Sequence, residues 1–269
     1  PYKLEHSRKV EDLGRIYDRQ YSLVAYMNKK LRSVALDGMV EVDQKSSHPR
    51  SFAALYGKMF DGQKVPEIVH TVAYQREQFI RDELLPYYEL DDTPFNRGVF
   101  KQIFTTFLYG GGIEAAVIQK KEKKMPREVK KKFMLPNGKT KALHPLLKEY
   151  KKEIKKVLNI IKEEYPEIHQ KVSLALEEHR CNSNDSSITQ AQADYKNLGR
   201  TLSYILQDME TCITCIAVLR MIELGMVEQK NGHYILSFLH DGVFIRGAAL
   251  NDKFLTELSG HVTGLIGFQ

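Results

Sequence analysis

The sequence predicts an α+β fold, and three features of its 269 residues support this prediction. A short apolar run, MVEVD at 39–43, is typical of a short buried strand. Several amphipathic helical patterns follow it. Two further apolar runs, at 233–239 and 243–247, are separated by a tight turn and indicate an antiparallel hairpin. A strand near one end, a hairpin near the other and helices between them favour a small sheet with segregated helices.

The first half of the chain is predicted to be helical apart from that strand. Residues 1–35 have a polar, helix-like pattern, and Pro49 indicates the start of a helix after the strand. Residues 65–85 have the pattern of an amphipathic helix. The dipeptide Thr93-Pro94 is typical of a helix cap and first turn, so we expect a helix over 95–110 that ends in three glycines.

The middle of the chain is strongly basic. The whole chain has a net charge of +6, whereas residues 119–156 hold fifteen Lys or Arg and four Glu, which gives +11. Such a concentrated basic arm favours a nucleic-acid partner with salt-dependent affinity. The alternative is the solvated side of an amphipathic helix over 149–165. Its apolar face would consist of Ile154, Val157, Leu158 and Ile161.

The remaining elements and the general composition follow. A polar loop at 181–187 precedes a long predicted helix over 191–224, which Gly225 closes. No apolar run approaches the ~18 residues of a membrane span, so we expect no membrane association. Three cysteines suit a reducing compartment, and the N-terminus shows no secretory signal, so we expect a cytoplasmic protein. The chain begins with Pro1, which indicates a processed or excised piece.

Two aspartates stand at the ends of predicted strands. Asp43 ends the first strand, and Asp241 lies at the tip of the hairpin. Each by itself is more commonly a helix cap or a turn residue. Together, two carboxylates at strand ends can hold two Mg²⁺ ions about 4 Å apart, which clamp the attacking and leaving oxygens of a phosphoryl transfer.

A cationic helix lies between these aspartates in the sequence. Arg97 and Lys101 are one turn apart on the same face, an arrangement that suits a polyphosphate. Tyr109 is two turns further along, where a flat ring could stack on a base. The alternative is an ordinary exposed pair of cations with a tyrosine in the core.

The order of these clusters resembles the family A polymerases, including the single-subunit phage and mitochondrial RNA polymerases. VDQKSSHPR, with Asp43, is similar to motif A of that family. RGVFKQIFTTFLYG matches the Arg-x3-Lys-x7-Tyr-Gly spacing of motif B, and FLHDGVF, with His240 and Asp241, is similar to motif C. The resemblance covers about residues 14–246.

The resemblance implies a polymerase right hand, in which a small antiparallel sheet with helices forms the palm and helices form the fingers. It divides the chain into three segments. Residues 1–92 would be a first palm segment with motif A, residues 93–190 the fingers with motif B and the basic insertion, and residues 191–269 a second palm segment with motif C.

The resemblance also implies roles for the residues of the catalytic site. Asp43 and Asp241 would bind two Mg²⁺ ions, with Mn²⁺ as the alternative metal. Arg97 would bind the outer phosphates of a nucleoside triphosphate. Lys101 would neutralise charge on the leaving pyrophosphate, and Tyr109 would close over the new base pair.

Further residues would contact a DNA template and primer, with RNA as the alternative. His240 would contact the primer end, and Gln207 and Arg15 would contact the minor groove. The basic insertion would grip the template through lysines such as Lys123, Lys124 and Lys131.

One departure from the family pattern bears on the choice of sugar. His48 stands five residues after Asp43, where DNA polymerases of this family usually have Glu, and we expect it in the nucleotide-binding site. We favour a DNA polymerase because a bulky histidine would exclude a ribose 2′-hydroxyl. Two further departures are Thr105, where the DNA enzymes have an aromatic ring, and Gly242, where they commonly have Glu.

Three alternatives remain beside DNA polymerisation. One is a single-subunit RNA polymerase or a primase-like enzyme, and another is untemplated nucleotide addition. The third belongs to a different class: a non-catalytic nucleic-acid-binding module derived from a polymerase fold. The short chain fits a phage or mobile-element replication enzyme acting in a bacterial or phage-infected cell, and its oligomeric state stays open.

Overall fold

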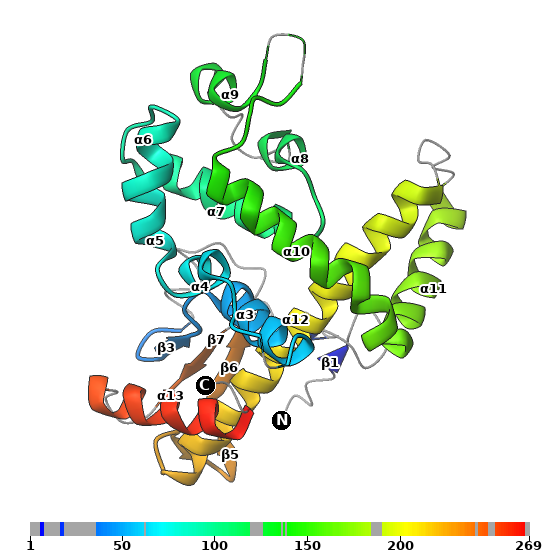
Figure 1. The fold of residues 1–269 in the computed structure, drawn as a ribbon. Coiled ribbons are helices and arrows are strands. Elements are labelled where there is room, and N and C mark those ends of the chain that lie inside the picture. Colours follow the sequence, from blue (N-terminus) through cyan, green and yellow to red (C-terminus); the bar gives the residue numbers. More distant parts are fainter. Residues whose placement is uncertain are drawn as a thin grey trace. The chain divides into compact units, whose positions relative to one another are not determined.

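A computed structural model gives the fold of the chain (Figure 1). The described residues are mostly helical and include a small antiparallel sheet, which confirms the α+β class. They form two compact units, Pro1–Ser47 with Leu206–Gln269, and His48–Ile205. The structure describes residues 6–7, 17–18, 36–61, 63–118, 126–135, 137, 139–183, 190–239, 242–246 and 251–266.

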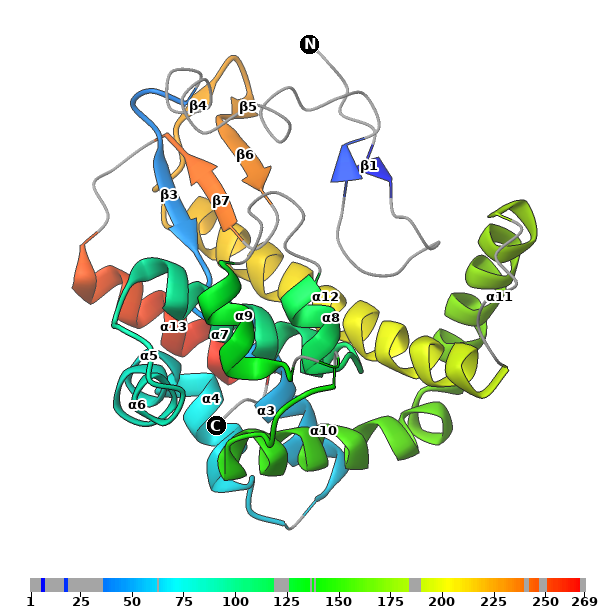
Figure 2. The ribbon, with the colours of Figure 1, turned by 90° about the horizontal axis from the view of Figure 1, so that it is seen from above.

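The first unit is built on a three-stranded antiparallel sheet with the order β3-β7-β6. Strands β3 (Val40–Asp43), β6 (Leu236–Leu239) and β7 (Gly242–Ile245) lie side by side in Figure 2. The predicted strand at 39–43 is confirmed, but the expectation that it is buried is wrong, because Val40 is 40% exposed. An edge strand has a neighbour on one side only, so its side chains are less covered than those of the central strand.

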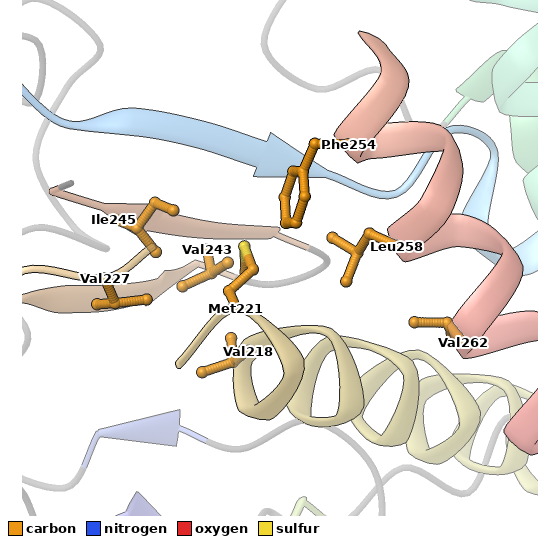
Figure 3. Packing of buried hydrophobic residues seen from close by; sticks show 8 residues of the cluster. All are labelled: Val218, Met221, Val227, Val243, Ile245, Phe254, Leu258 and Val262. Atoms are coloured by element: carbon orange, nitrogen blue, oxygen red, sulfur yellow. The ribbon is translucent and has the colours of Figure 1, made fainter. Parts of the chain in front are cut away.

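The core of the first unit lies between the sheet and two helices. Side chains from α12 (Gln190–Glu223), β7 and α13 (Asp252–Ile266) meet there, as Figure 3 shows. The sequence patterns did not predict a helix at α13. The buried cluster consists of Val218, Met221, Val227, Val243, Ile245, Phe254, Leu258 and Val262.

A second hairpin precedes β6. Strands β4 (Gln229–Lys230) and β5 (His233–Tyr234) pair around Asn231 and Gly232, which have positive φ angles of 51° and 78°. Such a two-residue turn is the expected hairpin connection for an Asn-Gly pair. The predicted single strand over 233–239 is therefore divided at Ile235, since β5 pairs with β4 whereas β6 pairs with β7.

The described N-terminal residues form two short strands. Strand β1 (His6–Ser7) pairs antiparallel with β2 (Tyr17–Asp18), so the predicted helix is wrong at these residues. A segment that is polar on all sides has no apolar stripe to bury, and its helical pattern is a weak signal. The other residues of 1–35 lie outside the described residues.

The second unit begins with α3 (Ser47–Met59), which starts two residues before Pro49. The predicted helix over 65–85 is interrupted at Gln75, whose φ of −122° is not helical. It consists of α4 (Glu67–Tyr74), α5 (Arg76–Phe79), the π-helical turn η1 (Ile80–Leu84) and α6 (Leu85–Tyr87).

Helix α7 (Pro94–Leu108) begins where the sequence predicts. The hydroxyl oxygen of Thr93 accepts a hydrogen bond from the backbone N–H of Asn96 at 3.1 Å and so caps the helix. Gly110, with a φ of +75°, follows its C-terminal end.

Helix α10 (Pro145–Glu164) confirms the predicted amphipathic pattern, because all four residues of its predicted apolar face are buried. It packs against α4, α7 and α11. An aromatic core surrounds Tyr150, whose ring lies 6.2 Å from that of Phe52 and 5.6 Å from that of Phe104. The other helices of the basic region and its surroundings are α8 (Ile113–Ile118), α9 (Arg127–Phe133) and α11 (Pro166–Ser183).

Helix α12 begins in the second unit and ends in the first. The predicted helix over 191–224 is confirmed, and Gly225 follows it with a φ of +67°. The predicted loop at 181–187 begins instead inside α11, and its residues 184–187 lie outside the described residues. Residues 48–92, which the sequence resemblance assigned to a first palm segment, belong to the second unit. Within the described residues, every helix is too short or too polar to cross a membrane.

Candidate functional site

Asp43 lies at the end of β3 that adjoins the hairpin β6–β7. In the antiparallel register, Asp43 is opposite Gly242, and Gly242 is in turn opposite Leu239 on β6. Asp43 is exposed. A Cβ added at Gly242 would lie 3.4 Å from Asp43 Oδ1 and 3.0 Å from the backbone oxygen of Val42. The Asp43 carboxylate is therefore beside the first residue of β7, and the tighter of the two contacts is with the backbone of β3.

The predicted motif C residues His240 and Asp241 lie outside the described residues, as do Arg15, Lys123 and Lys124. The structure does describe the residues on both sides of the pair, Leu239 and Gly242, which are opposite each other in the sheet.

The residue after Asp43 is fixed to α12. The Gln44 side-chain amide donates to the backbone oxygen of Glu210 at 2.8 Å and to Thr214 Oγ1 at 2.6 Å. Its oxygen accepts a hydrogen bond from Ser47 Oγ at 3.0 Å. All four residues belong to the first unit. These bonds hold the chain where it passes from β3 into α3, which limits the positions that Asp43 can take.

Arg97 and Lys101 lie one turn apart on α7, as predicted, and each is paired with a carboxylate. Lys101 Nζ lies 2.6 Å from Glu77 Oε1, and Arg97 Nη1 contacts Asp92 Oδ1. Asp92 also lies 3.5 Å from Arg81 Nε. The Lys101 and Glu77 side chains are 44% and 42% exposed, so an anion from solvent can reach this pair.

The charges around Glu77 set its protonation. Burial raises the pKa of the Glu77 carboxyl, but the hydrogen bond and charge of Lys101 lower it, and so do the charges of Arg76 and Arg97. The net result is a pKa below the usual value for Glu. The carboxylate is therefore ionised at neutral pH and neutralises part of the positive charge of α7.

Tyr109 and His48 meet at the end of α7. Tyr109 Oη and His48 Nδ1 share a hydrogen bond, and the two rings pack edge to face with centroids 5.8 Å apart. They are 61 residues apart in the sequence and belong to the same unit. The structure thus brings together two of the residues that the resemblance places in the nucleotide-binding site.

A glycine of α12 allows the backbone at Tyr109 to come close. A Cβ added at Gly199 would lie 2.2 Å from the Tyr109 backbone oxygen and 3.2 Å from the Gly110 nitrogen. No side chain fits at that position unless the two segments move apart. Gly199 therefore helps to determine where Tyr109 lies.

The other predicted nucleic-acid contacts that the structure describes are on two helices. Gln207 lies on α12, as predicted, and is partly buried in the first unit. Lys131 lies on α9 and pairs with Glu128 at 3.6 Å. A lysine that already has a carboxylate partner brings less net charge to a phosphate than an unpaired one.

Four residues of this region have no motif in the sequence. Glu77 and Asp92 precede the cationic helix as unremarkable acidic residues, and Gly199 is one glycine inside a long helix. For Gln44, the only feature of the sequence that indicates a role is its position next to Asp43. Their partners are distant in sequence, so periodicity alone could not identify these contacts.

The donors at this site suit a hard divalent cation. Mg²⁺ prefers carboxylate oxygens and keeps several waters, which an exposed strand-end aspartate permits. Among the described residues no group of three or more His, Cys, Asp or Glu could hold a metal ion. The resemblance gives the role of metal ligands to Asp43 and Asp241.

Comparison of the chain with family models, with curated proteins and with solved structures finds no significant match.

Proposed function

We propose that this chain is a template-directed nucleotidyltransferase, with DNA polymerisation favoured. It would add nucleotides to the 3′ end of a primer, using nucleoside triphosphates and two Mg²⁺ ions. The observation that supports this best is the register of Asp43 opposite Gly242. Asp241 is the residue before Gly242 in the sequence. Two-metal phosphoryl transfer uses carboxylates that hold both ions, and the resemblance gives this role to Asp43 and Asp241.

The first unit would be the palm of a polymerase right hand, and the second would contain the fingers. A three-stranded antiparallel sheet packed against α12 and α13 fits a small palm. Motif B lies on α7 of the largely helical second unit.

The reaction joins the primer to the incoming nucleotide. The primer 3′-oxygen attacks the α-phosphorus, a phosphorus–oxygen bond forms, and the bond to the departing pyrophosphate breaks while the hydroxyl proton leaves to solvent. Bound Mg²⁺ would supply Lewis-acid stabilisation of the charge that develops. Arg97 would orient the outer phosphates and Lys101 would stabilise the pyrophosphate, because this chemistry depends on positioning and electrostatics.

The Glu77 and Asp92 carboxylates would be replaced by phosphate oxygens when a nucleotide binds. Both pairs are partly exposed, and exposed ion pairs are worth only about 0–1 kcal/mol. A triphosphate offers several negative charges to the same two cations, so the exchange is favourable. The ion pairs would keep the side chains of α7 ordered until the substrate arrives.

His48 and Tyr109 would form the side of the pocket that meets the sugar. The hydrogen bond between them holds the imidazole against the phenol ring. We expect the bulk of this pair to hinder a ribose 2′-hydroxyl that is directed at it. This contact supports a preference for deoxynucleotides over the RNA polymerase alternative.

The test is extension of a labelled primer on a template in Mg²⁺, with dNTPs and NTPs in separate reactions. Asp43→Asn and Asp241→Asn should each abolish extension, because each removes one metal-binding charge. Glu41→Gln is the matched control, since Glu41 is exposed on the same face of β3, two residues before Asp43. It should extend primers as the unmodified chain does.

The outcomes separate the alternatives. Extension in the NTP reaction alone would establish the RNA polymerase alternative, and product that ignores the template sequence would establish untemplated addition. No extension with either substrate, while DNA is still bound, would favour the non-catalytic binding module.

A further inference from the structure

Helix α10 has a row of lysines on its solvent side. Residues separated by three, four or seven positions share one face of a helix. Four lysines of α10 have these spacings, and all are exposed, while the opposite face is buried in the core. We call them the lysine stripe: Lys148, Lys152, Lys155 and Lys162.

The stripe differs from three other lysines of the basic region, which have carboxylate partners. Lys131, Lys132 and Lys156 are paired with Glu128, Glu89 and Glu153 respectively. None of the four stripe lysines forms an ion pair with a residue that the structure describes. Glu149 and Glu163 lie on one flank of the stripe, and its net charge is still positive. Arg127, Lys130 and Lys139 also form no ion pair with a described residue, but the stripe sets four such cations in a row on one face of a single helix.

The length of the stripe fits a nucleic-acid backbone. From its first to its last lysine α10 rises about 21 Å, at 1.5 Å per residue. One strand of B-DNA has a phosphate about every 3.4 Å along the axis, so the stripe runs along roughly six nucleotides. Lysine ammonium groups bind phosphates as point charges and do not distinguish bases. The expected partner is therefore a phosphate backbone of any sequence.

An anionic membrane is the other polyanion to consider, and the burial of α10 argues against it. A helix that lies on a bilayer inserts its apolar face between the lipids. The buried face of α10 includes Tyr150, Ile154 and Leu158, which are at most 1% exposed because they pack in the protein core. Helix α10 could therefore bind a membrane only through the charge of its lysines, without inserting apolar side chains.

We propose that the lysine stripe is a sequence-independent binding surface for the backbone of the template or product strand. The inference deepens the proposed function and rests on it for the identity of the strand. It assigns to α10 the template binding that the resemblance assigned to Lys123, Lys124 and Lys131 of the basic insertion.

The test compares two variants that lose the same charge. Lys152→Gln with Lys155→Gln removes the centre of the stripe. Lys132→Gln with Arg220→Gln is the matched control, because both of its cations are paired with glutamates. Binding of labelled single-stranded and duplex DNA is measured by fluorescence anisotropy between about 50 and 200 mM salt. Circular dichroism and thermal unfolding check that each variant is folded.

The slope of log K against log salt is negative for such binding. We expect the stripe variant to make it less steep by about 1.4 to 1.8, because each of the two lost phosphate contacts contributes about 0.7 to 0.9. The control should change the slope by less than half of that. Equal slopes in both variants, or an unchanged slope in the stripe variant, would overturn the inference. A stripe variant that lost binding to phosphatidylserine vesicles and kept its DNA binding would overturn it as well.

Two results distinguish this inference from the proposed function. Stripe-dependent DNA binding by a chain that extends no primer would remove the polymerase proposal and leave the binding surface. Primer extension with a salt slope that does not depend on the stripe would remove the binding surface and leave the polymerase proposal. Absence of DNA binding by the unmodified chain at 50 mM salt would overturn both.

Discussion

Asp43 and Gly242 face each other across the β3–β7 pair, and the aspartate carboxylate lies beside the glycine. A methyl group at Gly242 would be 3.4 Å from Asp43 Oδ1 and 3.0 Å from the Val42 backbone oxygen. The second of these distances is tighter than ordinary packing, so the strands would have to adjust by a few tenths of an ångström. The small residue at the start of β7 therefore affects the spacing of β3 and β7 at the position of Asp43.

We expect Gly242→Ala to lower primer extension on the order of ten-fold, because small displacements of catalytic groups cost much activity. Stability should change little, since a small strand shift relieves the contact. Steady-state extension rates and urea unfolding of the same preparation measure the two effects. Full activity in the variant would show that extension does not depend on the exact spacing of β3 and β7 beside Asp43.

The contact between His48 and Tyr109 gives a prediction on sugar selection. His48→Ala removes the imidazole and leaves an open space beside the phenol ring. We expect the preference for dNTPs over NTPs to fall about ten-fold, since loss of one discriminating contact typically costs 1–3 kcal/mol. The ratio of kcat/KM values for dNTP and NTP on one template gives the measurement.

Tyr109→Phe is the companion variant, because it keeps the ring and removes the hydroxyl that His48 contacts. It should weaken the same preference to a smaller extent. If His48→Ala left the ratio unchanged, the imidazole would have no part in choosing the sugar. A parent chain that prefers NTPs would also exclude this role.

Gly199 gives a prediction on stability. Gly199→Ala places a methyl group 2.2 Å from the Tyr109 backbone oxygen, and the neighbouring atoms are backbone. We expect the free energy of unfolding to fall by about 1–3 kcal/mol, as in other overpacked sites. Gly260→Ala on α13 is the control, because nothing lies within 4 Å of its new methyl group.

The control should instead raise the free energy of unfolding by about 0.5–1 kcal/mol, because alanine favours the helix over glycine. Chemical denaturation of both variants gives the comparison. If Gly199→Ala were as stable as the parent, α12 would have to lie farther from the Tyr109 backbone than the structure places it.

The sequence was sufficient for elements whose signals are local. Thr93 and Pro94 define the start of α7 because a capping hydroxyl and a proline act within one turn. The apolar spacing of α10 predicts its buried face, since a helix repeats every 3.6 residues. Asn231 and Gly232 predict a turn because both tolerate positive φ, although the hairpin that they connect was not predicted.

Other features depend on neighbours that local patterns do not contain. MVEVD has the pattern of a buried strand, but Val40 is exposed because β3 is the edge of the described sheet. Helix α13 has buried residues spaced four apart, Phe254, Leu258 and Val262, within a segment rich in Gly and Thr that weakens the helical signal. The pairing of Lys101 with Glu77 depends on how α5 packs near α7, which no spacing rule predicts.

The pair of Glu77 and Lys101 predicts a pH dependence. The pKa of Glu77 is lowered in the folded chain, so the pair stabilises the fold above the unfolded pKa of about 4.3. That stability is lost as the pH falls through the lowered pKa. We expect Glu77→Gln to be less stable than the parent at pH 7 by at most about 1 kcal/mol, since the pair is partly exposed.

The difference between parent and variant should shrink below pH 4 and vanish once Glu77 is protonated. Thermal unfolding of both proteins at several pH values between about 3 and 7 gives the comparison. A difference that stays constant across this range would show that the carboxylate charge contributes nothing.

The same substitution tests whether the cations of α7 bind phosphates. Without the Glu77 carboxylate, Lys101 has lost its ion-pair partner, and a triphosphate no longer has to displace it. We expect Glu77→Gln to bind dNTP in Mg²⁺ about two- to five-fold more tightly, which corresponds to the value of an exposed ion pair. Titration calorimetry with a single dNTP measures the affinity.

Glu223→Gln is the matched control, because Glu223 is an exposed partner of Arg220 in the other unit. It removes the same charge from the chain and should leave the affinity unchanged. Equal tightening in both variants would show a general effect of net charge. Weaker binding by Glu77→Gln would mean that the carboxylate orders Lys101 for the substrate. The affinity lost because the Lys101 side chain becomes disordered would then exceed the affinity gained because its charge is no longer neutralised.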